Sequence, residues 1–238
     1  MRHQIEQLKT GPFVEETSFG NWFISSNTWK IRVLKIALND LERLFPEGVS
    51  KQRDVILDVG CGFGISFHEL ARRFQPSKIV ALDADPNLFN RASKAAKACS
   101  VPVELVDGNA ARMPFDDNSF DLVYCHQVFH HIVEQEAAMS EFYRVLKPGG
   151  VLLFAESTKR YIYSYLIRYL FSHPMAIQKT ASEYLDLIRS VGFSVPEAQI
   201  SYPYLWWSRE DLGLFEKLGF KPKQEREETL VNLVAVKK

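Results

Sequence analysis

Apolar positions along the chain show two kinds of spacing, and segments of one kind alternate with segments of the other. Short apolar runs of the kind that forms buried strands are separated by stretches of about a dozen residues with apolar side chains at helical spacing. The strand-like runs cover residues 55–59, 78–82, 101–106, 120–125, 151–155, 194–202 and 230–236. The helix-like stretches cover residues 29–45, 65–74, 86–98, 134–146 and 181–191. This alternation predicts an α/β fold with a doubly wound, mostly parallel sheet of seven strands.

The alternation loosens after residue 156. Residues 160–171 are rich in tyrosine and aliphatic side chains, and residues 209–218 form another helix-like stretch that Gly219 closes. This last stretch is either inserted between the final two strands or is their regular crossover helix, and the pattern leaves both arrangements open. Added helices at the N-terminus and after strand five complete the predicted fold.

The first predicted strand runs into a glycine-rich loop with the sequence Asp58-Val59-Gly60-Cys61-Gly62-Phe63-Gly64. Glycines at such a turn let the backbone bend sharply and let a ligand approach main-chain atoms. A dinucleotide fingerprint would place its third glycine one position later, where this chain has Ile65. The carboxylate of Asp58 would repel a diphosphate but suits a ligand that carries an ammonium and a sulfonium group. The loop therefore favours S-adenosylmethionine over NAD as the cofactor.

Asp83 follows the second predicted strand, about twenty residues after the glycine loop. An acidic side chain at this position accepts hydrogen bonds from the ribose hydroxyls of nucleoside cofactors. The alternative is that Asp83 caps the helix that begins near Pro86, because Asp is a favoured N-cap residue. Asp83 thus supports a nucleoside cofactor without identifying it.

Further motifs follow along the chain. Residues 107–110 read Asp-Gly-Asn-Ala, residues 113–115 read Met-Pro-Phe, and residues 120–123 read Phe-Asp-Leu-Val. In this order and spacing, the motifs resemble those of the class I S-adenosylmethionine-dependent methyltransferases, specifically the small-molecule branch called type 11. The resemblance covers residues 55–155. It implies a Rossmann-like methyltransferase fold with S-adenosylmethionine as methyl donor and S-adenosylhomocysteine as product.

The same resemblance implies a division of the chain and a reaction. We expect an N-terminal helical cap over residues 1–50 and a methyltransferase domain over residues 51–238, in which residues 157–220 include a substrate-recognition insertion. The expected reaction moves a methyl group to a small, apolar or aromatic acceptor by direct in-line displacement. Because the sulfonium is already activated, the protein's main task is to hold both reactants in place and to exclude water.

The cofactor residues that the resemblance implies share one location, the carboxyl ends of the first four strands. They are Asp58, Gly60, Cys61, Gly62, Gly64, Asp83, Ala84, Asn109, Ala110, His126 and Gln127. In this assignment the glycines line the methionine part, Asp58 holds the amino group and Asp83 takes the ribose. Asn109 stands where the family usually has Asp and reaches the adenine edge, with the backbone of Ala110 beside it. His126 and Gln127 lie next to the methyl group.

Three histidines are candidates for a general base or for metal ligands. His126 is a weak candidate for a general base, because a strand end opens onto the cleft, and we assign no catalytic base. His130 and His131 are adjacent, so we expect their side chains to point to different faces of a helix. With no matching Cys or carboxylate cluster in the sequence, we predict no metal site.

Aromatic residues are candidates for the acceptor pocket. The segment 161–171 is either a lid over a hydrophobic acceptor, a contact with a membrane surface or a helix packed on the sheet. Packing is the default for such a pattern, but the position after strand five, where the family that the chain resembles inserts substrate-recognition elements, favours the lid equally. Tryptophans and one phenylalanine outside this segment are further candidates for the pocket wall. They are Trp22, Phe23, Trp29, Trp206 and Trp207.

Composition limits the classes of molecule that the protein is expected to bind. Lys plus Arg and Asp plus Glu both number 29, so the formal net charge is zero, and nucleic acid is an unlikely main partner. Strand four ends in Cys-His-Gln-Val at residues 125–128, unlike the Asn/Asp-Pro-Pro-aromatic turn of amino-methylating base enzymes. An RNA or tRNA methyltransferase and a non-catalytic cofactor-binding module are the alternatives, and an NAD-dependent oxidoreductase ranks last.

Cysteine usage and hydropathy bear on location. The three cysteines have no disulfide or metal-ligand spacing, which fits a reducing, cytoplasmic setting. No run approaches the roughly 20 apolar residues of a spanning helix, so we expect no transmembrane segment. The sequence leaves the oligomeric state and the identity of the acceptor open.

Overall fold

The computed structural model describes residues 14–209, 219 and 227–238, and its centre is a mixed, mostly parallel sheet. The strand order is β3-β2-β1-β4-β5-β8-β6, with β7 also paired to β8. The strands are β1 (Val55–Val59), β2 (Lys78–Asp83), β3 (Val103–Asp107), β4 (Phe120–His126), β5 (Leu146–Ser157), β6 (Phe193–Ser194), β7 (Ile200–Ser201) and β8 (Leu230–Lys237). The first five strands are parallel to one another, and β8 is antiparallel to β5, β6 and β7.

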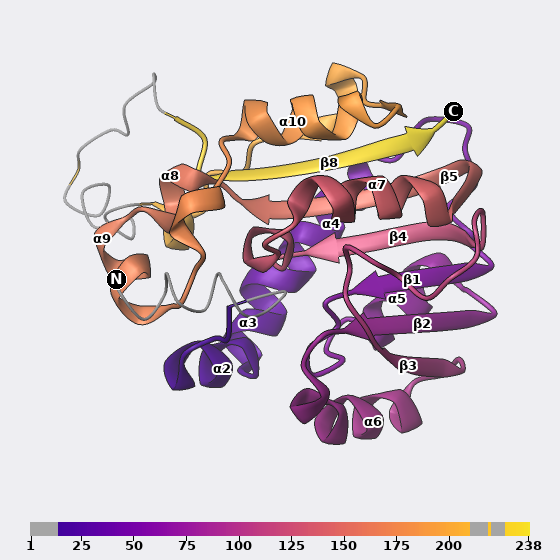
Figure 1. The fold of residues 1–238 in the computed structure, drawn as a ribbon, viewed down its shortest axis with the longest axis horizontal. Helices are drawn as coiled ribbons and strands as arrows, with labels where there is room; N and C mark the ends of the chain where they lie inside the picture. Colours follow the sequence, from indigo (N-terminus) through magenta and orange to yellow (C-terminus); the bar gives the residue numbers. More distant parts are fainter. Residues whose placement is uncertain (1–13, 210–218, 220–226) are drawn as a thin grey trace.

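Helices cover both faces of the sheet, as the alternation predicts (Figure 1). Helices α7 (Gln135–Val145) and α10 (Ala181–Ser190) pack on one face, and α4 (Lys35–Arg43) and α5 (Phe67–Phe74) pack on the other. The remaining helical elements are α2 (Ser18–Ile24), α3 (Asn27–Trp29), the π-helical η1 (Lys30–Leu34), η2 (Pro86–Leu88), α6 (Phe89–Ala98), η3 (Phe129–His131), α8 (Lys159–Ile162), α9 (Tyr165–Leu170), η4 (Met175–Ile177), η5 (Glu197–Gln199) and η6 (Trp206–Ser208). The predicted doubly wound α/β fold is confirmed.

Central strands are apolar on both sides because helices cover both faces. In β1, Leu57 belongs to the core under α7 and α10, whereas Ile56 belongs to the core under α4 and α5. The parallel register places Asp58 beside Tyr124 of β4. Both side chains therefore leave the sheet on the same face, near the carboxyl ends of their strands.

The C-terminal part of the sheet differs in detail from the expectation. The predicted strand over residues 194–202 is two short strands, β6 and β7, separated by the 3₁₀ turn η5. Pro196 precedes η5 and cannot donate a ladder hydrogen bond, which explains the interruption. The predicted strand over residues 230–236 is β8. Nearly all of the predicted helix over residues 209–218 lies outside the described residues.

The N-terminal region shares its core with the sheet. Leu38 and Leu41 of α4 are fully buried against the same cluster as α5. The division of the chain near residue 50 stays a prediction. None of the helices within the described part of the chain combines the length and apolarity needed to cross a membrane.

Short helices gather at one end of the sheet. The arrowheads of β1, β4 and β5 point toward the side where α2, α3, α8 and α9 lie, whereas that of β8 points away (Figure 1). The hydroxyl of Thr17 donates to the carbonyl of Leu170 at 2.7 Å, and the backbone amide of Ser172 donates to Glu16 at 3.0 Å. Segments that precede β1 and follow β5 are thus joined above the carboxyl ends of the strands.

A matched pair of glycine substitutions tests how tightly the loop after β1 packs. Gly64 and Gly48 have nearly the same positive φ, +73° and +75°, but only Gly64 is enclosed: an added Cβ would lie 2.4 Å from the ring of Phe67. Both Ala variants carry the backbone strain of about 1 to 2 kcal/mol, and overpacking adds about 1 to 3 kcal/mol in Gly64→Ala alone. Chemical denaturation measures both, and equal losses would contradict the packing assigned to Gly64.

Candidate active site

A cavity of about 310 Å³ lies at the carboxyl ends of β1, β2, β3 and β4. Ten of the predicted cofactor residues line it, and they come from four different loops. They are Asp58, Gly60, Cys61, Gly62, Asp83, Ala84, Asn109, Ala110, His126 and Gln127. Gly64, the remaining predicted residue, does not line the cavity, because its α-carbon faces Phe67 and Ala95. Gly64 therefore permits close packing of the loop on the helices rather than contact with a ligand.

The glycine loop is anchored to the neighbouring strand. The backbone amides of Gly60 and Cys61 donate to the carbonyl of Leu82 at 2.8 and 3.2 Å. An added Cβ at Gly60 would overlap Val128 at 2.1 Å, whereas one at Gly62 would meet no atom within 4 Å. Gly60 thus allows close packing below the loop, and Gly62 leaves open space on the side that lines the cavity.

Asp58 is a buried acid at the floor of this loop. Its carboxyl group is 2% exposed and accepts a hydrogen bond from the hydroxyl of Ser66. Burial raises the pKa of Asp58 from its ordinary value of 3.8 to about 7, and the nearby carboxylate of Asp83 adds to the increase. A positively charged group in the cavity would favour the ionised form of Asp58.

Asp83 holds the turn at the end of β2. Its Oδ2 accepts from the amide of Gly62 at 2.7 Å, and its Oδ1 accepts from the amide of Asp85 at 3.0 Å. Burial raises the pKa of Asp83, while these backbone donors oppose the increase. The helix cap considered for Asp83 is instead made by Asp85, which accepts from the amide of Asn87. Carboxylate lone pairs beyond the two amide bonds remain for a ligand.

The side chain of Asn109 also makes a hydrogen bond to the backbone. Its Oδ1 accepts from the amide of Ala111 at 2.8 Å and so fixes the turn after β3. Its amide NH₂ is the part of the side chain that remains for a ligand. The expected contact of Asn109 with the adenine edge therefore depends on this NH₂ group, because the side-chain oxygen already has a partner within the chain.

Two polar atoms at the end of β4 are buried without a hydrogen-bond partner among the described residues: the hydroxyl of Tyr124 and Nε2 of His126. Both residues line the cavity, and the ring of His126 lies 5.9 Å from those of Tyr124 and Trp29. Burial lowers the pKa of His126 to about 4. His126 is therefore neutral near pH 7 and a poor proton acceptor.

Tyr124 and Trp29 were not among the predicted cofactor residues. Tyr124 was detectable, because strand alternation places it on the same face as His126, two positions on. Trp29 reaches the cavity from a helix before β1, and no sequence spacing indicates that approach.

Gln127 has an unusual backbone conformation for a side-chain-bearing residue, with φ +53°. Its side-chain oxygen accepts from the hydroxyl of Ser157 at 2.6 Å, and its backbone amide donates to the carbonyl of Ala155 at 2.9 Å. The turn after β4 is thereby fixed to the end of β5.

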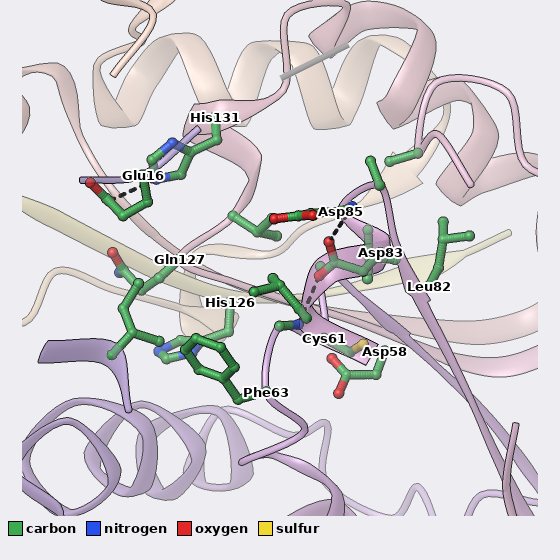
Figure 2. Close-up of a pocket in the computed structure, with 18 of the residues that line it drawn as sticks. Glu16, Asp58, Cys61, Phe63, Leu82, Asp83, Asp85, His126, Gln127 and His131 are labelled. Atoms are coloured by element: carbon green, nitrogen blue, oxygen red, sulfur yellow. Dashed lines mark hydrogen bonds and ion pairs between the residues drawn. The ribbon is translucent and has the colours of Figure 1, made fainter. Parts of the chain in front are cut away.

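A second cavity of about 50 Å³ adjoins the first. Five residues line both cavities, three from the segment before β1 and two from the segment after β4. They are Glu16, Ile24, Trp29, Gln127 and His131. The rest of the smaller cavity is mainly aromatic and aliphatic, with Phe23, Tyr161, Ile167, Phe171 and Trp207 in its lining. Figure 2 shows Glu16 and His131 facing each other at one side of the larger cavity, with Asp58 and Asp83 at the other.

The aromatic segment after β5 is divided between inward and outward side chains. Tyr161 and Phe171 line the smaller cavity, whereas Tyr165 and Tyr169 are 90% and 80% exposed. Trp22 is 64% exposed and lines neither cavity, and the side chain of Trp206 lies outside the described residues.

The adjacent histidines do not diverge as expected. The ring centroids of His130 and His131, both on the short 3₁₀ turn η3, are only 4.3 Å apart. His173, from the segment after α9, approaches both rings.

Comparisons with known proteins agree with the geometry. Residues 57–154, the span from β1 to β5 that carries most of the cavity, match the family model of the type 11 methyltransferase domain. Residues 57–154 therefore form a domain of the class I methyltransferase type. A probable methyltransferase from Aspergillus luteorubrus is 30% identical over 149 residues, which are 58% of this chain and 52% of that protein. The sterol 24-C-methyltransferase of Saccharomyces cerevisiae is 35% identical over 105 residues, covering 43% of this chain and 27% of that enzyme.

The chain spans about half or less of the length of these curated relatives. Among solved structures, the plantazolicin methyltransferase in complex with S-adenosylhomocysteine superposes with a TM-score of 0.65 and 16% identity. That superposition covers 92% of this chain and 89% of the other, and at this identity it supports the fold.

The raised pKa of Asp58 predicts that the stability of the protein depends on pH. Because the folded pKa is about 7 and the ordinary value 3.8, the folded state binds more protons between these values, and stability falls as pH rises through that interval. The difference of about three pKa units corresponds to a loss on the order of 4 kcal/mol between pH 4 and 7. Urea denaturation of the cofactor-free protein across this range measures the slope.

Asp58→Asn should remove most of this slope, and Asp107→Asn, which changes an exposed carboxyl at the neighbouring strand ends, should keep it. An unchanged slope in Asp58→Asn would show that Asp58 is already ionised in the folded protein at low pH.

Proposed function

We propose that this methyltransferase binds S-adenosylmethionine in the larger cavity and transfers its methyl group to a small, apolar or aromatic acceptor in the smaller one. The observation that carries the proposal is the arrangement of the two cavities. Acidic and glycine residues at the ends of β1 and β2 line the larger, aromatic residues line the smaller, and the two share a wall.

The described residues fit the cofactor. Asp58 is a buried acid whose ionised form a ligand ammonium would stabilise, and Gly62 leaves space for the ligand's approach. Asp83 offers carboxylate oxygens for ribose hydroxyls, and the amide of Asn109 can donate to a ring nitrogen of adenine. The hydroxyl of Tyr124 and Nε2 of His126, which have no partner among the described residues, would form hydrogen bonds with the ligand.

The cofactor supplies an activated methyl group on its sulfonium. In the proposed reaction a nucleophilic atom of the acceptor attacks this methyl, the carbon–sulfur bond breaks, and S-adenosylhomocysteine remains. The chain's contribution is to position both reactants and to exclude water. The low pKa of His126 argues against proton abstraction by this residue.

An apolar acceptor is supported by the lining of the smaller cavity. No Lys or Arg among the described residues lines either cavity, whereas Glu16, Asp58 and Asp83 do line the larger one. An acidic wall disfavours a polyanion such as RNA. Relatives of this chain include sterol and phosphoethanolamine methyltransferases, whose names span apolar and polar acceptors.

The cofactor assignment is tested with a matched pair of variants. The wild type should bind S-adenosylmethionine and S-adenosylhomocysteine and should not bind NAD in calorimetry. Asp83→Ala should weaken binding by about 1 to 3 kcal/mol, since charge-assisted hydrogen bonds are lost. Asp107→Ala removes a carboxylate from the next strand end, outside the cavity lining, and should bind normally. Equal affinities for the two variants would refute the ribose assignment, and NAD binding alone would refute the cofactor.

The acceptor assignment is tested with an acceptor found by mass spectrometry from a metabolite screen with labelled S-adenosylmethionine. Phe171→Ala should lower kcat/KM about ten- to hundredfold, because a buried aromatic contact contributes about 1.5 to 3 kcal/mol. Affinity for S-adenosylhomocysteine should change little. Tyr169→Ala, which alters an exposed side chain of the same segment, should leave both unchanged.

The alternatives give different outcomes. A fall in melting temperature together with lost cofactor affinity in Phe171→Ala would indicate a packing role. A screen that yields only tRNA or another polyanion would refute the apolar acceptor. Tight cofactor binding with no product from any acceptor would favour a non-catalytic binding module.

A further inference from the structure

Three histidines from distant parts of the chain meet beside the smaller cavity. His130 and His131 lie on η3, and His173 lies between α9 and η4. The ring centroids are 4.3 Å apart for His130 and His131, 5.2 Å for His130 and His173, and 4.9 Å for His131 and His173. One nitrogen from each ring lies within 4.8 Å of the other two.

His130 is oriented in the way typical of metal-binding histidines. Its Nδ1 lies 2.6 Å from Oε2 of Glu156, which is fully buried. A metal ligand histidine commonly donates its other ring N–H to such a carboxylate, which fixes the tautomer and the ring plane. Donation by Nδ1 leaves Nε2 of His130 as the nitrogen with a free lone pair.

His131 and His173 have unused polar atoms. Nδ1 of each is buried without a hydrogen-bond partner among the described residues, and His173 is 5% exposed overall. Unpaired buried polar atoms are unfavourable in the protein alone.

A carboxylate completes the cluster. Oε2 of Glu16 lies 3.9 Å from Nε2 of His131, while Oε1 of Glu16 accepts from the amides of Thr17 and Ser172. Two ligands with metal bonds of about 2.0 to 2.1 Å lie about 3.3 Å apart in a tetrahedral site. Oε2 of Glu16 lies on the Nε2 side of the His131 ring, so Glu16 joins the same ion when His131 binds it through Nε2.

Hydrogen bonds hold the contributing segments together. Gln178 donates to the carbonyls of His130 and Pro174 at 2.9 and 3.0 Å, which links η3 to the segment that carries His173. Glu16 bonds the amide of Ser172, the residue before His173. The cluster is thus built from three segments whose backbones are fixed to one another.

We propose that His130, His131 and His173, together with Glu16, bind one divalent first-row transition metal ion, with Zn²⁺ as the type that a tetrahedral set of three imidazoles and a carboxylate suits. His131 and Glu16 line both cavities, so the ion would lie between the cofactor cavity and the acceptor cavity. There it would stand within reach of an oxygen or nitrogen donor of the acceptor.

The test uses tag-free full-length protein, treated with chelator and titrated with Co²⁺, whose visible absorption reports its coordination. The wild type should bind one Co²⁺ per chain with the absorption of a four-coordinate site, and one equivalent of Zn²⁺ should displace it. His173→Gln should weaken Co²⁺ binding at least about a hundredfold, more than loss of an outer-shell contact costs. His68→Gln, which alters an exposed histidine on α5, should bind as the wild type does.

Further variants keep the proposal open to refutation. Circular dichroism tests whether each variant is folded. If His173→Gln does not fold, His131→Gln provides the same comparison. Glu16→Gln should change the absorption spectrum and weaken binding. A wild type without stoichiometric Co²⁺, or equal affinities for the cluster variants and His68→Gln, would overturn the proposal whether or not the protein binds S-adenosylmethionine.

Discussion

The buried carboxylate of Glu156, at the end of β5, fixes the turn on which both cavities depend. Its Oε1 accepts from the backbone amides of Val128 and Phe129, each at 2.8 Å, and its Oε2 pairs with His130. Hydrogen bonds to a charged acceptor contribute about 1.5 to 3 kcal/mol each, and a buried carboxylate without them would be strongly unfavourable. The turn after β4 therefore has one conformation, and Gln127 tolerates its positive φ within it.

Most of the fold could be predicted from the sequence, because the local pattern of apolar residues determines the main strands and helices. The five parallel strands are apolar runs buried on two faces, and residues such as Asp58 and Asp83 lie at strand ends that the sheet necessarily brings to one edge. The division of the C-terminal strand into β6 and β7 depends on one proline and on pairing with β8, whose position no local pattern gives.

The parts of the site that the sequence did not predict depend on contacts between distant segments. His173 reaches His130 only because α8 and α9 turn the chain back over the sheet's edge. Trp29, which the sequence indicated only as a candidate for the acceptor pocket, also lines the larger cavity. Gly64 is a residue whose motif position indicated a ligand contact but whose surroundings, Phe67 and Ala95, give it a packing role. Motif spacing predicts which loop is involved more reliably than which atom faces the ligand.

The wall shared by the two cavities has a thermodynamic consequence. Trp29, Gln127 and His131 belong to both linings, so a ligand that restricts these side chains in one cavity alters the free energy of binding in the other. Linkage is reciprocal: the factor by which one ligand changes the affinity of its neighbour equals the factor in the opposite direction. If the methyl donor and its demethylated product restrict these shared side chains to different degrees, the affinity for the acceptor would differ between the two complexes. Product release would then be energetically coupled to the loss of the methyl group.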